Sequence, residues 1–281
     1  MVERHFHDVF FNGKSLADFG LHVNGTDVFN SPEEDVESVE VPGRNGDLHI
    51  FNERFKNVEL KYHGFVAGNS FGNVSRYRQK AQVSNIPYFN LSKDEVAKNA
   101  ETMQSEFMAN MRSLRNYLLA NRGYRRLEDT YHPDEYRLAR FTGKIETSAL
   151  QLKAGEVDLT FDCKPQRFLK SGDFAITYTK SGSIFNPTFF TALPKLRVYG
   201  KGTLTIGDTI ITILSTLPYS YVDIDCEVQD AFYENGSTII NCNPYISLVD
   251  GDFFKIDPEI IPITLGSGIS KVEIIPRWWI V

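Results

Sequence analysis

Apolar and polar residues alternate over short stretches through most of the chain, a pattern typical of β-strands with one buried face. Residues 36–41 and 55–62 both show this alternation. Residues 42–47 between them, Pro-Gly-Arg-Asn-Gly-Asp, are rich in turn-forming types. We therefore predict two strands around a projecting loop over residues 36–62.

One segment has the period of an α-helix instead. Ser92 and Glu95 match a capping box, in which the serine accepts from a free backbone N–H and the glutamate reaches back to the cap. Apolar side chains then recur every three or four residues and so share one face: Val96, Ala100, Met103, Phe107, Met111, Leu114 and Leu118. We predict a long helix that buries this face and stops near Gly123. Residues 66–91 fit either a shorter helix near 74–83 or a loop.

The rest of the chain carries strand-like alternation only. Residues 156–163 alternate cleanly, and we expect Pro165 to end that strand. A Gly207-Asp208 turn between two apolar runs predicts a hairpin, and residues 221–228 alternate apolar side chains with acidic ones. Many short strands of this kind indicate a β-sandwich or jelly roll. The predicted fold is mainly β with one or two helices, which make the N-terminal domain α+β.

Composition and charge divide the chain in two. At 42% apolar and 23% charged, it is a globular chain long enough for about two domains. Residues 1–172 carry 23 Lys and Arg against 24 Asp and Glu, whereas residues 173–281 carry 7 against 12. We predict domains at 1–172 and 173–281. The net charge of −6 argues against a dedicated nucleic-acid binder.

Other function classes find little support in the sequence. No run approaches the ~18 apolar residues of a membrane span, and the first residues lack the basic and apolar parts of a signal peptide. Three cysteines are too few for a disulfide scaffold. Phosphate-binding, dinucleotide and nucleophile-elbow motifs are absent. We expect no cofactor, no membrane and no enzymatic activity.

Several groups of residues are candidates for metal or acid–base sites. His5 and His7 share a face if they lie on a strand, but a third ligand is missing at informative spacing. The acidic row of Asp223, Asp225 and Glu227 fits a calcium or glycosidase site, or simply the solvent face of a strand. Neither group predicts a metal site.

Three further groups also have a structural interpretation. The acidic pairs 128–129 and 134–135 lie among Arg125, Arg126, Arg137 and Arg140, which favours salt bridges over catalysis. Cys163 with His132 as base would make a nucleophile, but Cys163 falls on the apolar phase of its strand. Trp278-Trp279 fits a sugar platform or an anchor for the last strand. We predict no catalytic residue.

Four motifs resemble the distal tail protein (Dit) family of long-tailed siphophages. In chain order they are Pro-Gly-Arg-Asn-Gly-Asp at 42–47, Gly-Tyr-Arg-Arg-Leu-Glu-Asp-Thr-Tyr-His-Pro-Asp at 123–134 followed by Tyr136-Arg137, Phe-Asp-Cys-Lys-Pro-Gln-Arg-Phe at 161–168, and Ile-Pro-Arg-Trp-Trp at 275–279. They run along nearly the whole chain, and the middle two are highly specific. The sequence departs from the usual pattern at 64–105 and matches only loosely at 252–268.

The resemblance implies a hexameric ring at the tip of a phage tail. It implies an N-terminal β-sandwich ring domain with a helix and a projecting hairpin, and a galectin-like β-sandwich outside the ring. The implied partners are the tail tube protein, the tail-associated lysin, a receptor-binding protein and, in some members, a host wall saccharide. The opening would let the tape measure and then DNA pass, and the location would be the virion, after synthesis in the host cytoplasm.

Candidate contact residues follow from combining the motifs with this expectation. Residues of the 42–47 loop, Arg44, Asn45 and Asp47, would contact a neighbouring subunit, with the loop adding an arm to that subunit's sheet. Arg125 and Arg126 would cross a subunit interface or stay within an intrachain salt-bridge network. If the C-terminal sandwich instead binds cell-wall carbohydrate, Tyr221 and Tyr233 are the candidate glycan contacts.

Overall fold

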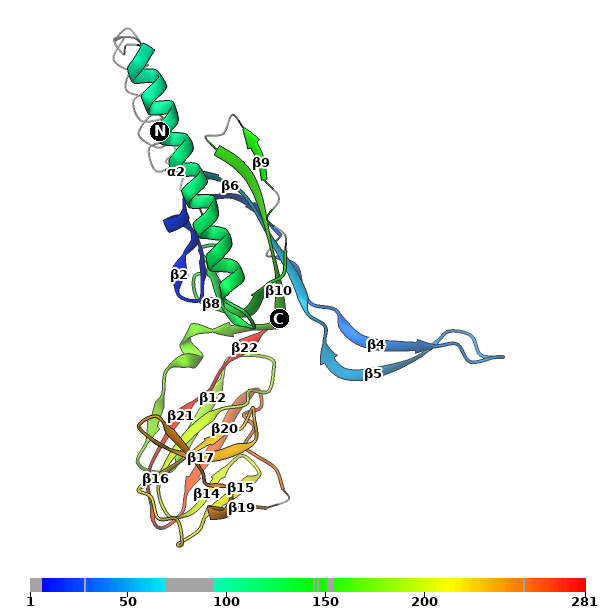
Figure 1. Ribbon diagram of the computed structural model, residues 1–281. Coiled ribbons are helices and arrows are strands. Elements are labelled where there is room, and N and C mark those ends of the chain that lie inside the picture. The colour runs from blue at the N-terminus through cyan, green and yellow to red at the C-terminus, as the bar shows by residue number, and fades with distance from the viewer. Residues whose placement is uncertain are drawn as a thin grey trace. The chain divides into compact units, whose positions relative to one another are not determined.

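The computed structural model describes residues 7–27, 29–68, 93–143, 145, 147–150, 154–249 and 251–281. The chain forms two compact units: Met1–Pro165 with Val281, and Gln166–Ile280. Both units are built mainly of strands, and α2 (Lys93–Ala120) is the α-helix among the described residues, so the predicted mainly β class is confirmed (Figure 1). The predicted boundary at 172/173 falls in the 3-10 helix η2 (Lys170–Asp173), just beyond this division.

The strands of the N-terminal unit pair in the order β2-β1-β7-β8-β10-β6-β3, with β9 beside β10 and β4–β5 as a separate pair. Their bounds are β1 Val9–Phe11, β2 Lys14–Ser15, β3 Leu21–Thr26, β4 Glu34–Val39, β5 Leu48–Phe55, β6 Val58–Ala67, β7 Arg125–Asp129, β8 Glu135–Phe141, β9 Thr147–Leu150 and β10 Ala154–Leu169; the 3-10 helix η1 spans Leu16–Phe19.

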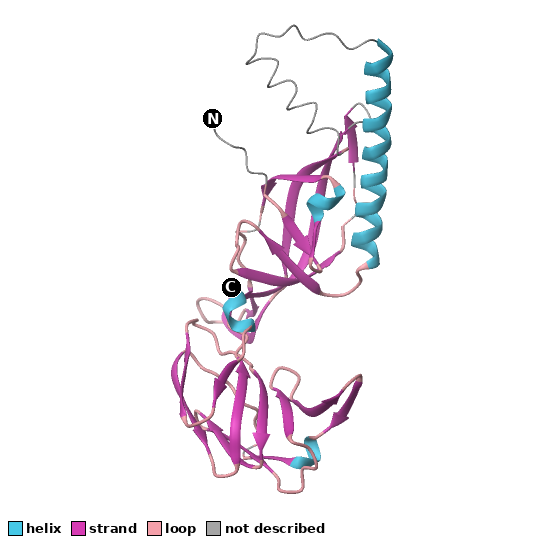
Figure 2. Cartoon of the chain, turned by 90° about the vertical axis from the view of Figure 1, so that its left-hand side faces the viewer, coloured by secondary structure: helices cyan, strands magenta, loops and turns pink. Residues whose placement is uncertain are grey.

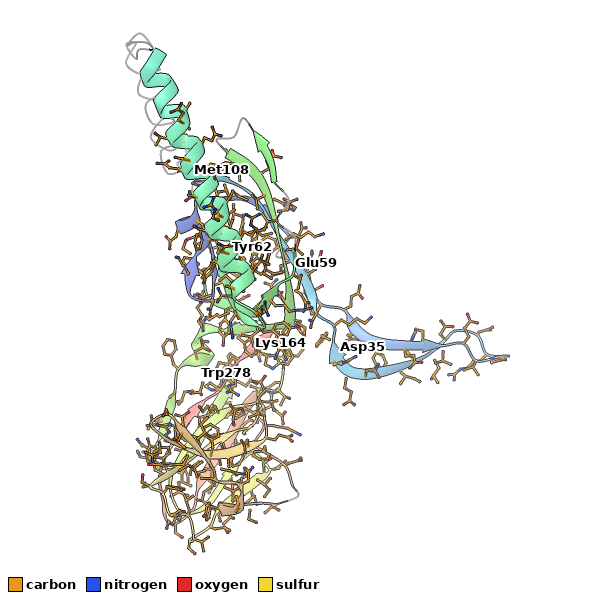
Figure 3. All side chains as sticks on the ribbon, in the orientation of Figure 1. Asp35, Glu59, Tyr62, Met108, Lys164 and Trp278 are labelled. Carbon is orange, nitrogen blue, oxygen red and sulfur yellow. The ribbon has the colours of Figure 1, made fainter. Side chains whose placement is uncertain are left out.

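This sheet rolls over on itself, because strands far apart in its order touch. The Tyr62 hydroxyl on β6 donates to Asp129 on β7 at 2.7 Å, and Phe11 on β1 lies 5.2 Å from Phe161 on β10 between ring centroids. An isolated bridge between His7 and Val23 links the two ends of the roll. One core therefore fills the inside of a sandwich-like sheet, where Figure 3 labels Tyr62.

Helix α2 covers this core with the face that the sequence predicted. Met103, Phe107, Leu114 and Leu118 are buried. Its first residue is Lys93, so the capping residue Ser92 and the alternative helix at 74–83 lie outside the described residues.

Gly20, which ends η1 at φ +71°, has no room for a Cβ, which would lie 2.3 Å from the Ala67 carbonyl oxygen. Among the described residues, no helix is both long and apolar enough to cross a membrane.

The predicted pair of strands around residues 42–47 needs one correction. The partner of β4 is β5, with Val39 opposite Leu48, and β6 begins after it as a third strand. Phe55 ends β5 instead of opening the second predicted strand. The six turn-forming residues nevertheless lie at the hairpin tip, as predicted, because Gly43 and Gly46 adopt positive φ there.

The C-terminal unit is a β-sandwich of two antiparallel sheets, as predicted (lower strands in Figure 2). One sheet has the order β11-β21-β13-β16-β17-β18 and the other β12-β20-β14-β15-β19. The strand bounds are β11 Ile176–Tyr178, β12 Gly182–Asn186, β13 Lys195–Gly200, β14 Gly202–Ile206, β15 Thr209–Ile213, β16 Tyr221–Asp225, β17 Asp230–Asn235, β18 Thr238–Asn241, β19 Ile246–Leu248, β20 Glu259–Leu265, β21 Ile269–Ile275 and β22 Trp279–Ile280, and the 3-10 helix η3 spans Asn243–Tyr245.

Both sheets contribute to a single apolar core, with Leu204 and Ile211 from one and Val222 and Val272 from the other. The predicted hairpin at Gly207-Asp208 is present as β14–β15. The prediction that Pro165 ends its strand is wrong, because β10 continues to Leu169. On one edge, β10 pairs with β6 up to Cys163 and with β22 from Arg167, so the proline's missing N–H falls between the two pairings.

Candidate interaction surfaces

The hairpin β4–β5, residues 34–55, forms an arm, and within the part of the chain that the structure describes its strands pair only with each other. Val39, Leu48 and Ile50 share one of its sides, since Val39 lies opposite Leu48 and Ile50 lies two residues further along β5; all three are exposed. Phe51 on the opposite side is exposed as well. An isolated two-stranded hairpin is marginally stable in water. The apolar side of the arm therefore has the character of a surface that another chain covers.

The predicted contact residues Arg44, Asn45 and Asp47 all lie at the exposed tip of this arm. The Arg44 N–H donates to the Val41 carbonyl oxygen at 3.1 Å, which closes the turn and leaves the side chains of the tip pointing outward. Charged and amide groups in this position can make polar contacts with a neighbour. Sequence reasoning found the tip but missed the apolar side behind it, although Leu48 and Ile50 flank His49 in a strand-like alternation.

An ion pair sits near the base of the arm. Arg54 Nε lies 2.6 Å from Asp35 Oδ2, and Figure 3 labels Asp35 there. Hydrogen bonding from Arg54 lowers the pKa of the Asp35 carboxyl, despite an opposing desolvation effect. The two strands of the arm are thus joined by an ion pair near the base and by a turn at the tip.

Arg126 makes two close contacts within the chain. Its Nε lies 2.7 Å from Glu128 Oε1, and its guanidinium stacks over the Tyr136 ring at 3.7 Å. Arg140 likewise pairs with Asp162 at 2.7 Å. These contacts support the intrachain network that the sequence left open for this region. Arg125, at the start of β7, is exposed.

Two other members of this region have roles that the sequence did not predict. Arg137 is buried, and its Nη1 lies 3.2 Å from the Pro165 carbonyl oxygen. Asp129 accepts hydrogen bonds from the Tyr62 hydroxyl and from the backbone N–H groups of Tyr131 and His132. Burial, followed by the charge of Asp129, raises the pKa of Tyr62 well above its usual range. Asp129 therefore organises a turn in place of pairing with arginine.

The residues considered for nucleophilic or metal chemistry lie in unsuitable surroundings. Cys163 is fully buried in the core, whereas His132 is partly exposed and lies beside Asp129 and the Phe29 ring. His7 stacks on Tyr131 at 3.7 Å, and His5 lies outside the described residues. Burial also raises the pKa of the Cys226 thiol to about 12. Within the described ranges, no group of three His, Cys, Asp or Glu side chains is arranged to hold a metal ion.

The acidic row on β16 and the following turn is neutralised by two arginines. Arg197 binds Asp223 through two 2.7 Å hydrogen bonds. Arg277 binds Asp225 in the same way and lies 3.4 Å from Glu227. Asp223 lies on the outer face of its strand, as one of the interpretations had it, but its side chain is covered and only 1% exposed. The cause is that Arg197 extends across it from the neighbouring strand β13.

The two predicted glycan contacts lie in a cluster of tyrosines. Tyr233 stacks on Tyr219, with ring centroids 4.3 Å apart, and lies 4.7 Å from Tyr221. The Arg197 guanidinium lies 4.3 Å above the Tyr221 ring, and the Tyr221 hydroxyl donates to the Glu234 carbonyl oxygen. Both residues are partly buried. The structure thus brings the two tyrosines together, with much of their ring surface already in contact with neighbours.

The tryptophan pair anchors the last strand. Trp278 is buried in the core, and Trp279 in β22 pairs with Phe168 of β10. The indole N–H of Trp279 donates to the Thr191 carbonyl oxygen at 2.9 Å. Figure 3 labels Trp278. The structural interpretation of this pair is confirmed over the sugar platform.

The outer faces of the two C-terminal sheets differ in charge. The six-stranded sheet carries Lys195, Arg197, Asp223, Asp225, Asp230, Glu234, Lys271 and Glu273 on its outward positions. Outward positions of the five-stranded sheet are uncharged: Ser183, Phe185, Thr203, Thr205, Ile210, Thr212, Ser247, Ile260, Pro262 and Thr264. Sequence reasoning missed this second face, because only the pairing of strands from distant segments assembles it.

Comparison with known proteins gives structural matches that cover nearly the whole chain. No protein-family model and no curated protein matches the sequence. The crystal structure of the Dit protein of phage SPP1, described as a paradigm of the hub adsorption apparatus in phages that infect Gram-positive bacteria, aligns with a TM-score of 0.66 and 12% identity. The alignment covers 99% of this chain and 100% of that one.

Two structures of the phage p2 baseplate in its activated conformation, with strontium and with calcium, align at TM-scores of 0.46 and 0.48 and 9% identity. Each alignment covers 96% of this chain and 97% of the other. The chain thus has the fold of the SPP1 distal tail protein from end to end, as the motif resemblance implied.

Proposed function

We propose that this protein is the structural hub of a siphophage tail tip. Six copies form a ring that joins the tail tube to the tail-associated lysin protein and the receptor-binding apparatus, and DNA passes through its opening. The observation that carries the proposal is the full-length fold match to the SPP1 Dit protein. The protein acts without catalysis, and it is made in the host cytoplasm before assembly into the virion.

The arm supplies the contact that closes the ring. Its apolar side, Val39, Leu48 and Ile50, is exposed in the single chain, and its strands have free outer edges that can extend a neighbour's sheet. Arg44, Asn45 and Asp47 at the tip, together with the exposed Arg125, provide the polar contacts. Arg126 adds a further polar contact beside its intrachain pair with Glu128. A ring of identical chains needs such a head-to-tail contact between two different surfaces.

The mass of the purified protein in solution tests this proposal. Mass photometry should give six subunits, or a multiple of six if rings stack, and negative-stain images should show a central opening. A protein that stays monomeric at high concentration, with no pore in any particle, would contradict the hub role.

A second candidate function, favoured by the gathered tyrosines, is binding of cell-wall carbohydrate through the C-terminal sandwich. Tyr221 and Tyr233 lie 4.7 Å apart between ring centroids, and aromatic rings with a polar tip suit sugar recognition. Retention of the full chain on host cell walls should fall for Tyr221→Ala and persist for Tyr221→Phe. Equal retention of both variants, or none for the native protein, would exclude this function.

A further inference from the structure

Residues 185–190 of the C-terminal sandwich invert the usual rule of burial. Asn186 and Thr188 are buried, at 2% and 5% exposed, whereas Phe185 and Phe189 are 61% and 92% exposed. Apolar side chains normally occupy the interior and polar ones the surface. We name residues 186–190 the Phe189 loop. This inversion indicates that hydrogen bonding of the buried polar side chains, and not the burial of apolar surface, determines where the two phenylalanine rings lie.

A buried hydrogen-bond network holds the loop in this shape. The Asn186 amide donates to the carbonyl oxygens of Phe190 and Ile256, both at 2.9 Å. Its oxygen accepts from the Thr188 N–H at 3.0 Å, and the Thr188 hydroxyl lies 2.8 Å from the same oxygen. Buried polar groups that are fully paired fix one local conformation. The Asn186 side chain therefore ties both ends of the loop to the sandwich.

The residues that follow the loop are fixed as firmly. Ala192 and Ile256 exchange two backbone hydrogen bonds of 2.9 Å. Phe190 stacks on Trp279 at 4.4 Å, and the Trp279 N–H donates to Thr191. Phe189 thus stands between an anchored threonine and an anchored phenylalanine, with its own ring in water.

An exposed aromatic ring on a rigid support is the usual form of a binding anchor. Aromatic residues are prominent among interface residues that contribute most to affinity. A contact that is already ordered before binding avoids the entropy cost of ordering it. Phe185 and its register partner Ile260, also exposed, adjoin the base of the loop on the uncharged outer face. The apolar surface is thus wider than one ring.

Backbone strain marks the same place. Glu259, opposite Asn186 in the β12–β20 pairing, has a φ of +83°. This left-handed region is unfavourable for glutamate, and such strain persists where the surrounding structure imposes it. The strained residue keeps its carboxylate exposed beside the loop.

The charge around the loop indicates the kind of partner. Asp257, whose carboxylate accepts from the Thr191 hydroxyl at 2.7 Å, and Glu259 outnumber Lys255 on the adjoining segment. Residues 173–281 as a whole carry 7 basic against 12 acidic side chains. A second copy placed face to face would bring like charges together, and an anionic lipid or nucleic-acid surface would be repelled. Basic groups around an apolar socket complement this surface.

We propose that the Phe189 loop is the anchor by which the hub holds another virion protein. Phe189 enters an apolar socket whose rim carries lysine or arginine, and Asp257 and Glu259 face that rim. This inference rests on the proposed hub function, because it takes the partner to be a protein of the same tail tip.

Binding of the full chain to three purified proteins of the same phage tests the anchor: the tail tube protein, the lysin-bearing protein and the receptor-binding protein. In biolayer interferometry we expect the native chain to bind one of them, and Phe189→Ala to weaken that binding at least tenfold. Phe174→Ala is the matched control, because Phe174 is 72% exposed and lies outside the loop; its affinity should stay within twofold. The double variant Asp257→Asn, Glu259→Gln should slow association and reduce its salt dependence.

Several results would overturn the anchor. They are a native chain that binds none of the three proteins, equal binding by Phe189→Ala, or equal losses for Phe189→Ala and Phe174→Ala. A Phe189→Ala effect confined to self-association would make a second copy the occupant. The mass of the Phe189→Ala protein should remain that of the native ring, so failure of the anchor is distinct from failure of the hub.

Discussion

The arm and the Phe189 loop both hold apolar side chains in water, but they are supported in opposite ways. In the arm, Leu48 and Ile50 lie on a two-stranded hairpin, and among the described residues its strands pair with each other alone. In the loop, Phe189 is held in place by Asn186 and Thr188, whose side chains are buried and hydrogen-bonded. We therefore expect the arm to be stabilised by contacts with a neighbouring chain, whereas the loop is stabilised by hydrogen bonds within its own chain.

Because of this difference, substitutions in the two regions should affect different properties. One region should affect the stability of the single chain and the other the assembly of the ring. A substitution under the loop should lower the free energy of unfolding of the single chain and leave the ring interface untouched. Conversely, a substitution on the arm should leave that free energy unchanged and disrupt the ring, because the lost contacts lie between chains.

The largest effect on unfolding is expected for Asn186→Ala. The substitution leaves the buried Thr188 N–H without its acceptor, at ~1–2 kcal/mol, and removes one of the two hydrogen bonds at the Phe190 and Ile256 carbonyl groups, at ~0.5–1 kcal/mol each, or about 3 kcal/mol in all. Urea denaturation followed by tryptophan fluorescence measures this loss. Asn45→Ala at the exposed arm tip is the matched control and should shift stability by less than ~0.5 kcal/mol. Similar losses of unfolding free energy in the two variants would contradict the proposed difference between the loop and the arm.

Arg197→Ala should cost somewhat less, about 2 kcal/mol. It leaves the Asp223 carboxylate, 1% exposed, without its two hydrogen bonds, but Arg197 is itself partly exposed, so water reaches part of the gap. Arg197→Lys keeps the charge and loses the paired geometry, and it should fall between the two. Native-like stability of Arg197→Ala in urea would show that the C-terminal unit does not depend on this pair.

The double variant Leu48→Ser, Ile50→Ser should change the unfolding free energy of the monomer by no more than ~1 kcal/mol, because both side chains are exposed, at 44% and 45%, and a surface substitution usually changes it by ~0.5 kcal/mol or less. Its ring should nevertheless be lost in mass photometry. His49→Ser, on the opposite side of β5, serves as the control and should assemble. If the double variant still forms native-sized rings, the apolar side of the arm is not the subunit contact.

The smallest effect concerns pH. Burial alone would raise the pKa of Asp225, but the hydrogen bonds and charge of Arg277, with the N–H groups of Glu227 and Val228, bring it below its usual value. A carboxyl with a lowered pKa in the folded state contributes stability above its unfolded pKa of about 3.9, and this stability is lost as pH falls through the folded value. Arg277→Met removes the main groups that lower this pKa while burial still raises it, so the loss of stability on acidification should become smaller. Identical acid profiles for both proteins would refute the assignment.

The sequence correctly predicted the elements that depend on a pattern of neighbouring residues. The helical stripe from Met103 to Leu118 and the hairpin turn at Gly207-Asp208 both form as expected. The tip of the arm, with Arg44, Asn45 and Asp47, follows from local turn chemistry in the same way. The predicted roles of these residues in subunit contact stay predictions, as do those of Tyr221 and Tyr233.

Pairing between distant residues was outside the reach of the sequence. Asp223 alternates with apolar neighbours like a solvent-facing residue, yet Arg197, 26 positions away, makes it a buried one. Pro165 looks like a strand end, because nothing local shows that β10 changes its partner there. Nothing in its neighbouring residues indicates that Phe189 lies in water, where the contacts from Asn186 to Ile256 hold it.

Local sequence alone determined that this chain is mainly β with one long amphipathic helix, because strand and helix periods and turn residues act over a few neighbouring positions. Tertiary structure decided which polar groups are buried and which apolar groups stay in water. Those outcomes depend on hydrogen bonds between distant segments, such as the one between Asn186 and Ile256, 70 positions apart. Such a bond contributes energy only once the fold has brought both partners together.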